Sequence, residues 1–171
     1  LLYGEDTRDH IVAAPDTRYV CDAMHIPYYG SKFGRPGLDV LTFPLDYPDP
    51  QGEFYGYDGW TFAAGDSAEQ AGTKMLVVIV GRIATALIAL RTGLYVGNKR
   101  ESMVLYRAHI NDEWTALVER VYTLCKEQWG YRVPTKAKDR RRLRELCRQA
   151  ITFENAFFSL YKDYLLKELH A

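Results

Sequence analysis

The stretch TKMLVVIVGRIATALIALRTG, residues 73–93, decides the fold. Within it, Met75–Leu90 is apolar at every position except Gly81, Arg82 and Thr85. A helix that is apolar on all sides is buried either in the middle of a fold or in a membrane. These sixteen residues, with an arginine near their centre, are too short and too polar to span a membrane. The stretch therefore predicts a central core helix.

Capping signals bound this helix and start the next one. Thr73 is the expected N-cap of the core helix, and Gly93 supplies its C-terminal stop. Asn98, followed three residues later by Glu101, is typical of a capping box. This signal predicts a second helix over Lys99–Ile110.

Two further helices complete the predicted bundle. Asp112 is expected to cap a helix that runs to about Gln128 and stops at Gly130. The last helix is predicted over Lys138–Leu169, because apolar residues recur there at helical spacing along one broad face. The residues of this face are Leu143, Leu146, Ala150, Phe153, Phe157, Leu160, Tyr161, Tyr164 and Leu165.

The chain before residue 73 is irregular. A Pro-Asp pair can open a short helix over Thr17–His25. Two alternating runs, Leu38–Leu45 and Glu53–Tyr57, predict a hairpin or an extended excursion. The predicted fold class is therefore mainly α: an up-down helical bundle of about four main helices, with a small β-hairpin-like insertion near residues 38–57.

The length and the charge distribution indicate one domain with two unlike parts. The 171 residues suit a single domain, with an irregular, acidic segment (1–72) before the helical bundle (73–171). Residues 1–70 contain 12 acidic and 4 basic side chains, whereas residues 71–171 contain 10 acidic and 18 basic ones. This split indicates one cationic and one anionic partner, or two parts that attract each other. Because the chain starts without Met, we expect it to be a piece of a longer protein or a processed one.

The cysteines and the termini indicate a cytoplasmic protein. Cys21, Cys125 and Cys147 are far apart and form no CxxC pair, so neither a zinc site nor a disulfide framework is predicted. The N-terminus has no targeting segment, and no membrane association is expected.

The most informative site candidate is the start of the second helix. The N-terminus of a helix has free N–H groups and the positive end of the helix dipole, so cations are disfavoured there. Lys99 and Arg100 in its first turn therefore have the wrong sign for stability, unless an anion binds at that turn. The alternative is a solvated Lys-Arg pair that Glu101 partly offsets.

Arg82 is a second candidate, because it lies in the middle of the apolar helix. A buried guanidinium needs a partner. That partner is either an acidic residue of the core or, if the side chain reaches a cleft, a phosphate or carboxylate of a ligand.

The order of these landmarks resembles a known family. Four segments are similar, in their order, to landmarks of the aminoglycoside nucleotidyltransferases. They are Leu1–Glu5 with Pro15 after it, Gly81–Ile83, Arg91–Gly93 and Asn98–Glu101. The resemblance is to their C-terminal helical domain, in the streptomycin and spectinomycin adenylyltransferases in particular. It covers most of the chain outside residues 26–58, and it depends on the order of motifs that are individually weak.

The resemblance implies transfer of a nucleoside monophosphate from ATP, or another NTP, to a small hydroxylated substrate. It implies that Arg82 and Lys99 bind the triphosphate, and it makes Tyr122 the nearest match to a tyrosine that the family uses. It further implies that a missing N-terminal catalytic domain holds Mg²⁺. No catalytic residue or metal ligand is expected in this chain.

The resemblance also implies a substrate-binding stretch. Asp58, Trp60 and Asp66 match the Trp- and Asp-bearing stretch that faces the antibiotic, and an acidic rim with an aromatic platform suits a cationic aminosugar. The alternative is a surface loop with a half-buried tryptophan. The long insertion at residues 27–59 departs from the drug-modifying members and leaves the acceptor open.

Two other functions stay open. One is a stand-alone helical subunit that accompanies a separate minimal nucleotidyltransferase, and the other is a non-catalytic structural interaction module.

The basic run Lys136–Arg148 would suit nucleic acid, but its basic residues fall mostly opposite Leu143, Leu146 and Cys147, as on a solvated helix face. Nucleic acid is therefore disfavoured as a partner.

Overall fold

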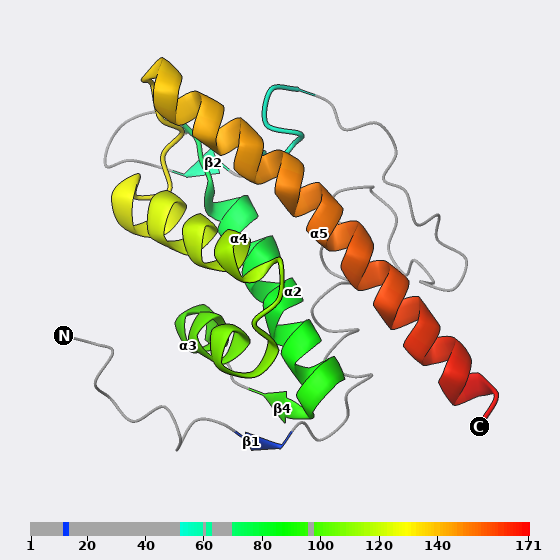
Figure 1. The fold of residues 1–171 in the computed structure, drawn as a ribbon. Coiled ribbons are helices and arrows are strands. Elements are labelled where there is room, and N and C mark those ends of the chain that lie inside the picture. The colour runs from blue at the N-terminus through cyan, green and yellow to red at the C-terminus, as the bar shows by residue number, and fades with distance from the viewer. Residues whose placement is uncertain (1–11, 14–51, 60, 63–69, 96–97) are drawn as a thin grey trace.

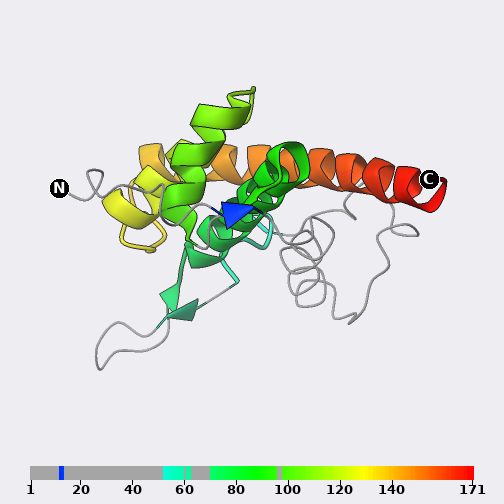
Figure 2. The ribbon, with the colours of Figure 1, turned by 90° about the horizontal axis from the view of Figure 1, so that it is seen from below.

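The computed structural model describes residues 12–13, 52–59, 61–62, 70–95 and 98–171 (Figure 1). Within these residues the fold is mainly α, as the sequence predicts. The long helix α5 runs along the helical region from one end to the other, and α2 lies beside it (Figures 1 and 2).

Helix α2 (Lys74–Thr92) is the predicted core helix. Its residues from Met75 to Ala89 are buried, apart from Gly81 and Arg82, which are half-buried. The helix contacts α3, α4 and α5, and so forms the centre of the fold. At 19 residues it is, within the described part of the chain, the one helix long and apolar enough to cross a membrane, so the prediction that the stretch is too short and too polar for this is wrong. The evidence for a core helix is instead its burial, because 67% of its most apolar 18-residue stretch is buried in the fold. Such burial is typical of the core helix of a soluble protein.

The C-terminal end of α2 has the predicted cap, whereas the N-terminal end does not. Gly93 has a φ of 68° and donates its N–H to the Ala89 carbonyl at 2.9 Å, so it is the predicted stop. Thr73 stands at the N-cap position but does not cap. Its hydroxyl instead donates to the carbonyl of Cys125 at 3.4 Å, because Thr73 is buried against the later helices.

The second predicted helix is present over its full range. It consists of α3 (Lys99–Leu105), continued by the π-helical segment η2 (Tyr106–Ile110). The side chain of Asn98 accepts a hydrogen bond from the Glu101 N–H at 2.9 Å, which is the expected cap. Asn111, at a φ of 48°, ends the helix in the left-handed conformation.

Replacing Asn98 by alanine is expected to lower the free energy of unfolding by about 0.5–2 kcal/mol, since the cap hydrogen bond is lost. Urea unfolding measures the change. Asn98→Ser keeps a capping oxygen and should retain most of the stability. Equal losses for both variants would contradict the capping role.

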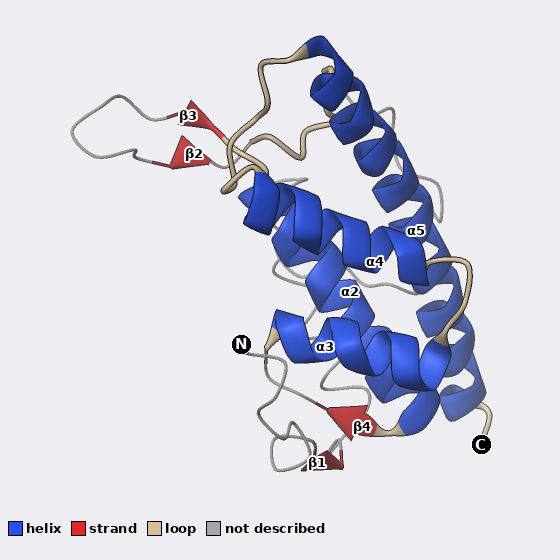
Figure 3. Ribbon diagram, turned by 60° about the vertical axis from the view of Figure 1, so that its left-hand side comes forward, coloured by secondary structure: helices blue, strands red, loops and turns tan. Residues whose placement is uncertain are grey.

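The next helix is α4 (Thr115–Arg120), continued by the π-helical segment η3 (Val121–Gln128). The N-cap position is Trp114 and has no side-chain cap, so the prediction that Asp112 caps this helix is wrong. The Asp112 carboxylate accepts the N–H of Trp114 at 3.0 Å in the turn before the helix. Gly130, with a φ of 54°, follows the end. Helices α3 and α4 lie side by side and both contact α2 (Figure 3).

Helix α5 (Ala137–Leu169) confirms the predicted last helix. The predicted face is buried at Leu143, Leu146, Ala150, Phe153, Phe157, Tyr161 and Leu165. The two exceptions are Tyr164, which is half-buried, and Leu160, which is 38% exposed because it lies at the edge of the broad stripe rather than on its centre line.

The described strands are short. Strand β1 (Val12–Ala13) pairs antiparallel with β4 (Leu94–Tyr95), and β2 (Thr61–Phe62) pairs antiparallel with β3 (Gln70–Ala71). In the predicted hairpin region, residues 38–51 lie outside the described residues, as does the predicted helix over 17–25. Residues 53–57 form turns instead of a strand, because Phe54 and Tyr57 are both buried and an alternating strand would not place both on one face.

Candidate anion-binding site

Two cationic side chains converge on one tyrosine hydroxyl. Arg100 donates through Nε to the Tyr122 hydroxyl oxygen at 3.2 Å, and Lys126 donates through Nζ to the same oxygen at 3.1 Å. The Lys126 ammonium also lies 4.9 Å from the centre of the Tyr122 ring. Because this oxygen accepts both bonds, the hydroxyl proton of Tyr122 is left to donate.

Local structure places the three groups together. The Asn98 cap starts α3, so Arg100 stands in the first turn of that helix. Tyr122 and Lys126 are four residues apart on η3, a spacing that puts both on one helix face. Tyr122 is 4% exposed, whereas Arg100 and Lys126 are half-buried. π-Helical segments occur frequently at functional sites.

The electrostatics of the cluster favour negative charge. Burial alone would raise the pKa of Tyr122, but the hydrogen bonds and charges of Arg100 and Lys126 lower it below its usual range. The hydrogen bond to Tyr122 raises the pKa of Lys126, although burial and the nearby charge of Arg100 act against it. The site therefore holds two neighbouring positive charges and a polarised phenol.

The space beneath the phenol is apolar and small. Tyr122 and Gly81 share a gap of about 10 Å³, too small to hold a ligand. The other residues that line this gap are Val77, Val80, Met103, Val118 and Val121. A ligand of this site would therefore bind over the polar end of Tyr122, against Arg100 and Lys126.

The structure brings together only part of the predicted phosphate-binding set. Arg100 and Tyr122 are in contact. Lys99 is the first residue of α3, and its side chain lies outside the described part. Arg82 follows Gly81, which lines the gap under Tyr122. The Arg82 side chain is half-buried, and it makes no hydrogen bond or ion pair with any described residue, so the acidic core partner that was one of its two alternatives is not found among them. Gly81 and Arg82 lie where α2 is only partly covered by the rest of the fold.

The predicted substrate-binding residues are described at one position only. Asp58 is half-buried in the turn over 52–59, where it lies beside Thr73 and Leu76 at the start of α2. No contact links it to Arg100, Tyr122 or Lys126 among the described residues. Trp60 and Asp66 lie outside the described residues.

Lys126 is the site residue that the sequence reasoning missed. The signal available was its spacing from Tyr122, since residues four apart meet on a helix. That spacing indicates a binding site only when the structure also shows that α3 brings Arg100 to the same hydroxyl of Tyr122.

The described part of the chain offers no support for a metal site or for a reactive cysteine. No group of three or more His, Cys, Asp or Glu residues there could hold a metal ion. Burial raises the pKa of the Cys125 thiol to about 12, so this cysteine is not a reactive thiolate.

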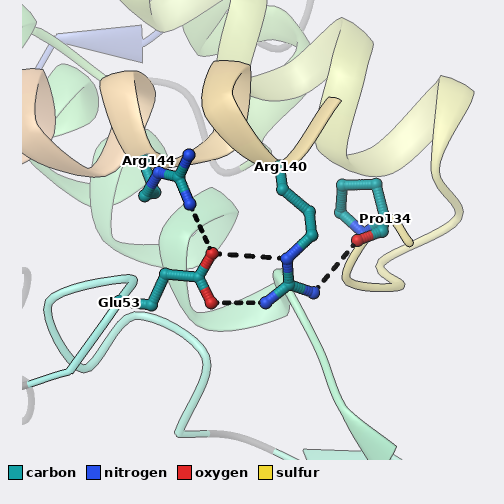
Figure 4. A network of polar contacts seen from close by, with 4 residues as sticks. All are labelled: Glu53, Pro134, Arg140 and Arg144. Atoms are coloured by element: carbon teal, nitrogen blue, oxygen red, sulfur yellow. Dashed lines mark hydrogen bonds and ion pairs between the residues drawn. The ribbon is translucent and has the colours of Figure 1, made fainter. Parts of the chain in front are cut away.

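Four of the seven basic residues in the run Lys136–Arg148 form ion pairs with described residues, and Figure 4 shows two of them, Arg140 and Arg144. The carboxylate of Glu53 pairs with Arg140 and accepts a hydrogen bond from Arg144 at 2.6 Å, and the bond from Arg140 holds the pKa of Glu53 below its usual range. Arg140 also donates to the Pro134 carbonyl at 3.2 Å. These contacts fix the turn over 52–59 against α5.

Comparisons of the chain with protein-family models, with curated proteins and with solved structures gave no match.

Proposed function

We propose that this chain is the nucleotide-binding helical domain of a nucleotidyltransferase, with Arg100, Tyr122 and Lys126 holding the phosphates of ATP or another NTP. The observation that supports the proposal is the convergence of Arg100 and Lys126 on the Tyr122 hydroxyl. Two like charges held this close repel each other, and an anionic ligand removes the repulsion. A phosphate suits the site because guanidinium, ammonium and phenol all donate hydrogen bonds to phosphate oxygens.

The remaining parts of the proposal come from the resemblance in the sequence. Lys99 and Arg82 would add charge around the triphosphate, and Asp58, Trp60 and Asp66 would face a small hydroxylated acceptor, with a cationic aminoglycoside as the proposed class. Mg²⁺ would be held by carboxylates of an N-terminal catalytic domain. A cytoplasmic location is consistent with Cys125 and Cys147, which are both free thiols.

A structural role is the alternative that one observation favours. The bonds from Arg100 and Lys126 to Tyr122 already join α3 to η3 without a ligand. On this alternative, removing either cation would lower stability and leave nucleotide affinity unchanged.

Calorimetric titration of the chain with ATP and Mg²⁺ separates the two functions. Arg100→Ala and Lys126→Ala are each expected to weaken ATP binding about tenfold, as a lost charge-assisted hydrogen bond would. Tyr122→Phe keeps the ring and should weaken binding less. Arg107→Ala is the matched control, since Arg107 is 59% exposed and pairs with Glu119 away from the cluster.

Two outcomes would overturn the proposal. One is the absence of saturable ATP binding up to millimolar concentrations. The other is an unchanged affinity in Arg100→Ala and Lys126→Ala, with unfolding experiments showing a loss of stability instead.

A further inference from the structure

A groove of about 270 Å³ lies between the end of α4 with the start of η3 on one side and the first turns of α5 on the other. Arg120 and Leu124 line one side, and Lys138, Arg141, Arg142 and Leu146 line the other. The two leucines are buried and form the floor, whereas the basic side chains stand around the rim. The volume is at the small end for ligand sites, so it suits a compact ligand.

Three of the four cations on the rim have no partner among the described residues. Arg142 pairs with Asp139 at 3.3 Å. Arg120, Lys138 and Arg141 are exposed, and they make no hydrogen bond or ion pair with any residue in the described part of the chain.

The one carboxylate on the rim does not neutralise them. Glu145 accepts hydrogen bonds from Arg148 at 2.6 Å and from Gln149 at 2.8 Å. The bond from Arg148 is the main reason that the pKa of Glu145 is lowered, and Arg120 contributes only through its charge. The groove therefore keeps a net positive charge.

Two of the unpaired cations lie near the start of α5, where positive charge is electrostatically unfavourable unless an anion binds nearby. Lys138 and Arg141 lie in the first two turns of a 33-residue helix, beside the positive end of its dipole. The first turn contains one acidic residue, Asp139, and Arg142 occupies it. An anion in the groove would interact favourably with the dipole and with the three free cations together.

We infer that this groove is a second anion-binding site, for a compact ligand that carries two or more linked phosphates. Guanidinium groups bind phosphate oxygens in pairs, which suits Arg120 and Arg141 on facing sides of the groove. A nucleic acid strand fits less well, because the neighbouring arginines of α5 form ion pairs and do not extend the free positive charge along the helix: Arg140 and Arg144 pair with Glu53, and Arg148 pairs with Glu145.

The groove is separate from the proposed nucleotide site. Arg120 and Leu124 alternate with Tyr122 and Lys126 along the chain, so a displacement of two residues puts the pairs on opposite sides of the helix. One pair lines the groove towards α5, and the other faces Arg100 on α3. The inference does not depend on the proposed function.

The test is calorimetric titration with inorganic tripolyphosphate at low salt. It is made in an Arg100→Ala/Lys126→Ala background, which removes the other anion site, and repeated in the wild-type chain. Adding Arg120→Ala, Lys138→Ala and Arg141→Ala is expected to weaken tripolyphosphate binding by at least about tenfold in the Arg100→Ala/Lys126→Ala background. In the wild-type chain the same three substitutions are expected to lower the number of tripolyphosphate molecules bound by one. Lys167→Ala, an exposed lysine at the far end of α5, is the matched control and should change nothing.

Arg141→Glu alone serves as a second variant, and circular dichroism verifies that each variant is folded. Undiminished tripolyphosphate binding in the folded groove variants would overturn the inference. A mixed-sequence single-stranded RNA that binds the same residues more tightly than tripolyphosphate would also overturn it, because the groove would then be part of a nucleic acid surface.

Discussion

Replacing Phe153 by alanine is expected to lower the free energy of unfolding by about 3–5 kcal/mol. Phe153 is fully buried on α5. Its ring lies 6.3 Å from that of Tyr106 on η2, edge to face, and 5.4 Å from that of Trp114 just before α4. The substitution would leave a cavity where three elements meet, so the lost apolar transfer and the cavity add together.

Urea unfolding followed by circular dichroism measures this loss. Leu160→Ala on the same helix is the matched control, since Leu160 is 38% exposed and removing it opens little cavity. We expect that control to cost about 1 kcal/mol or less. Similar losses for the two variants would mean that Phe153 does not hold the helices together.

Replacing Tyr57 by phenylalanine is expected to cost about 1–3 kcal/mol, although it removes a single oxygen atom. The Tyr57 hydroxyl donates to the carboxylate of Glu154, and these two residues are 1% and 0% exposed. This bond connects the turn over 52–59 to the middle of α5. Without it, a buried carboxylate loses a donor that water cannot replace.

A double-mutant cycle with Glu154→Met, which removes the acceptor oxygens and keeps the length of the side chain, tests whether the cost belongs to this pair. If the hydroxyl acts through Glu154, the two substitutions should couple by an amount comparable to the loss in Tyr57→Phe. Additive effects would show that Tyr57 stabilises the fold through packing alone.

Most helix boundaries could be predicted because they depend on local signals. Gly93 and Asn98 act through their own backbone and side chain, and both have the predicted role. Thr73 was assigned the wrong bond, because a buried residue contacts elements that are distant in sequence. The π-helical segments η2 and η3 were also missed. Their apolar residues satisfy an ordinary helical pattern, so the sequence carries no signal for the change in hydrogen bonding.

The candidate site could be predicted one residue at a time but not as a cluster. The charge of Arg100 at a helix start was visible in the sequence, since it contradicts the helix dipole. Its contact with Tyr122, 22 residues away, depends on how α3 packs against η3. Lys126 looked like an ordinary helix-surface lysine, and Arg82 looked buried because the sequence around it gives no sign of where α2 is left uncovered.

The burial of α2 has a consequence for the order in which the chain folds during synthesis. The elements that cover this helix come from both sides of it in the sequence: the turn with Phe54 and Tyr57 before it, and α3, η3 and α5 after it. A nascent chain that ends before Ala137 has nothing from α5 to cover it, and exposes a long apolar helix to chaperones and to other nascent chains. The most hydrophobic segment is therefore made well before its last covering helix, and folding is completed only when the C-terminal part has left the ribosome.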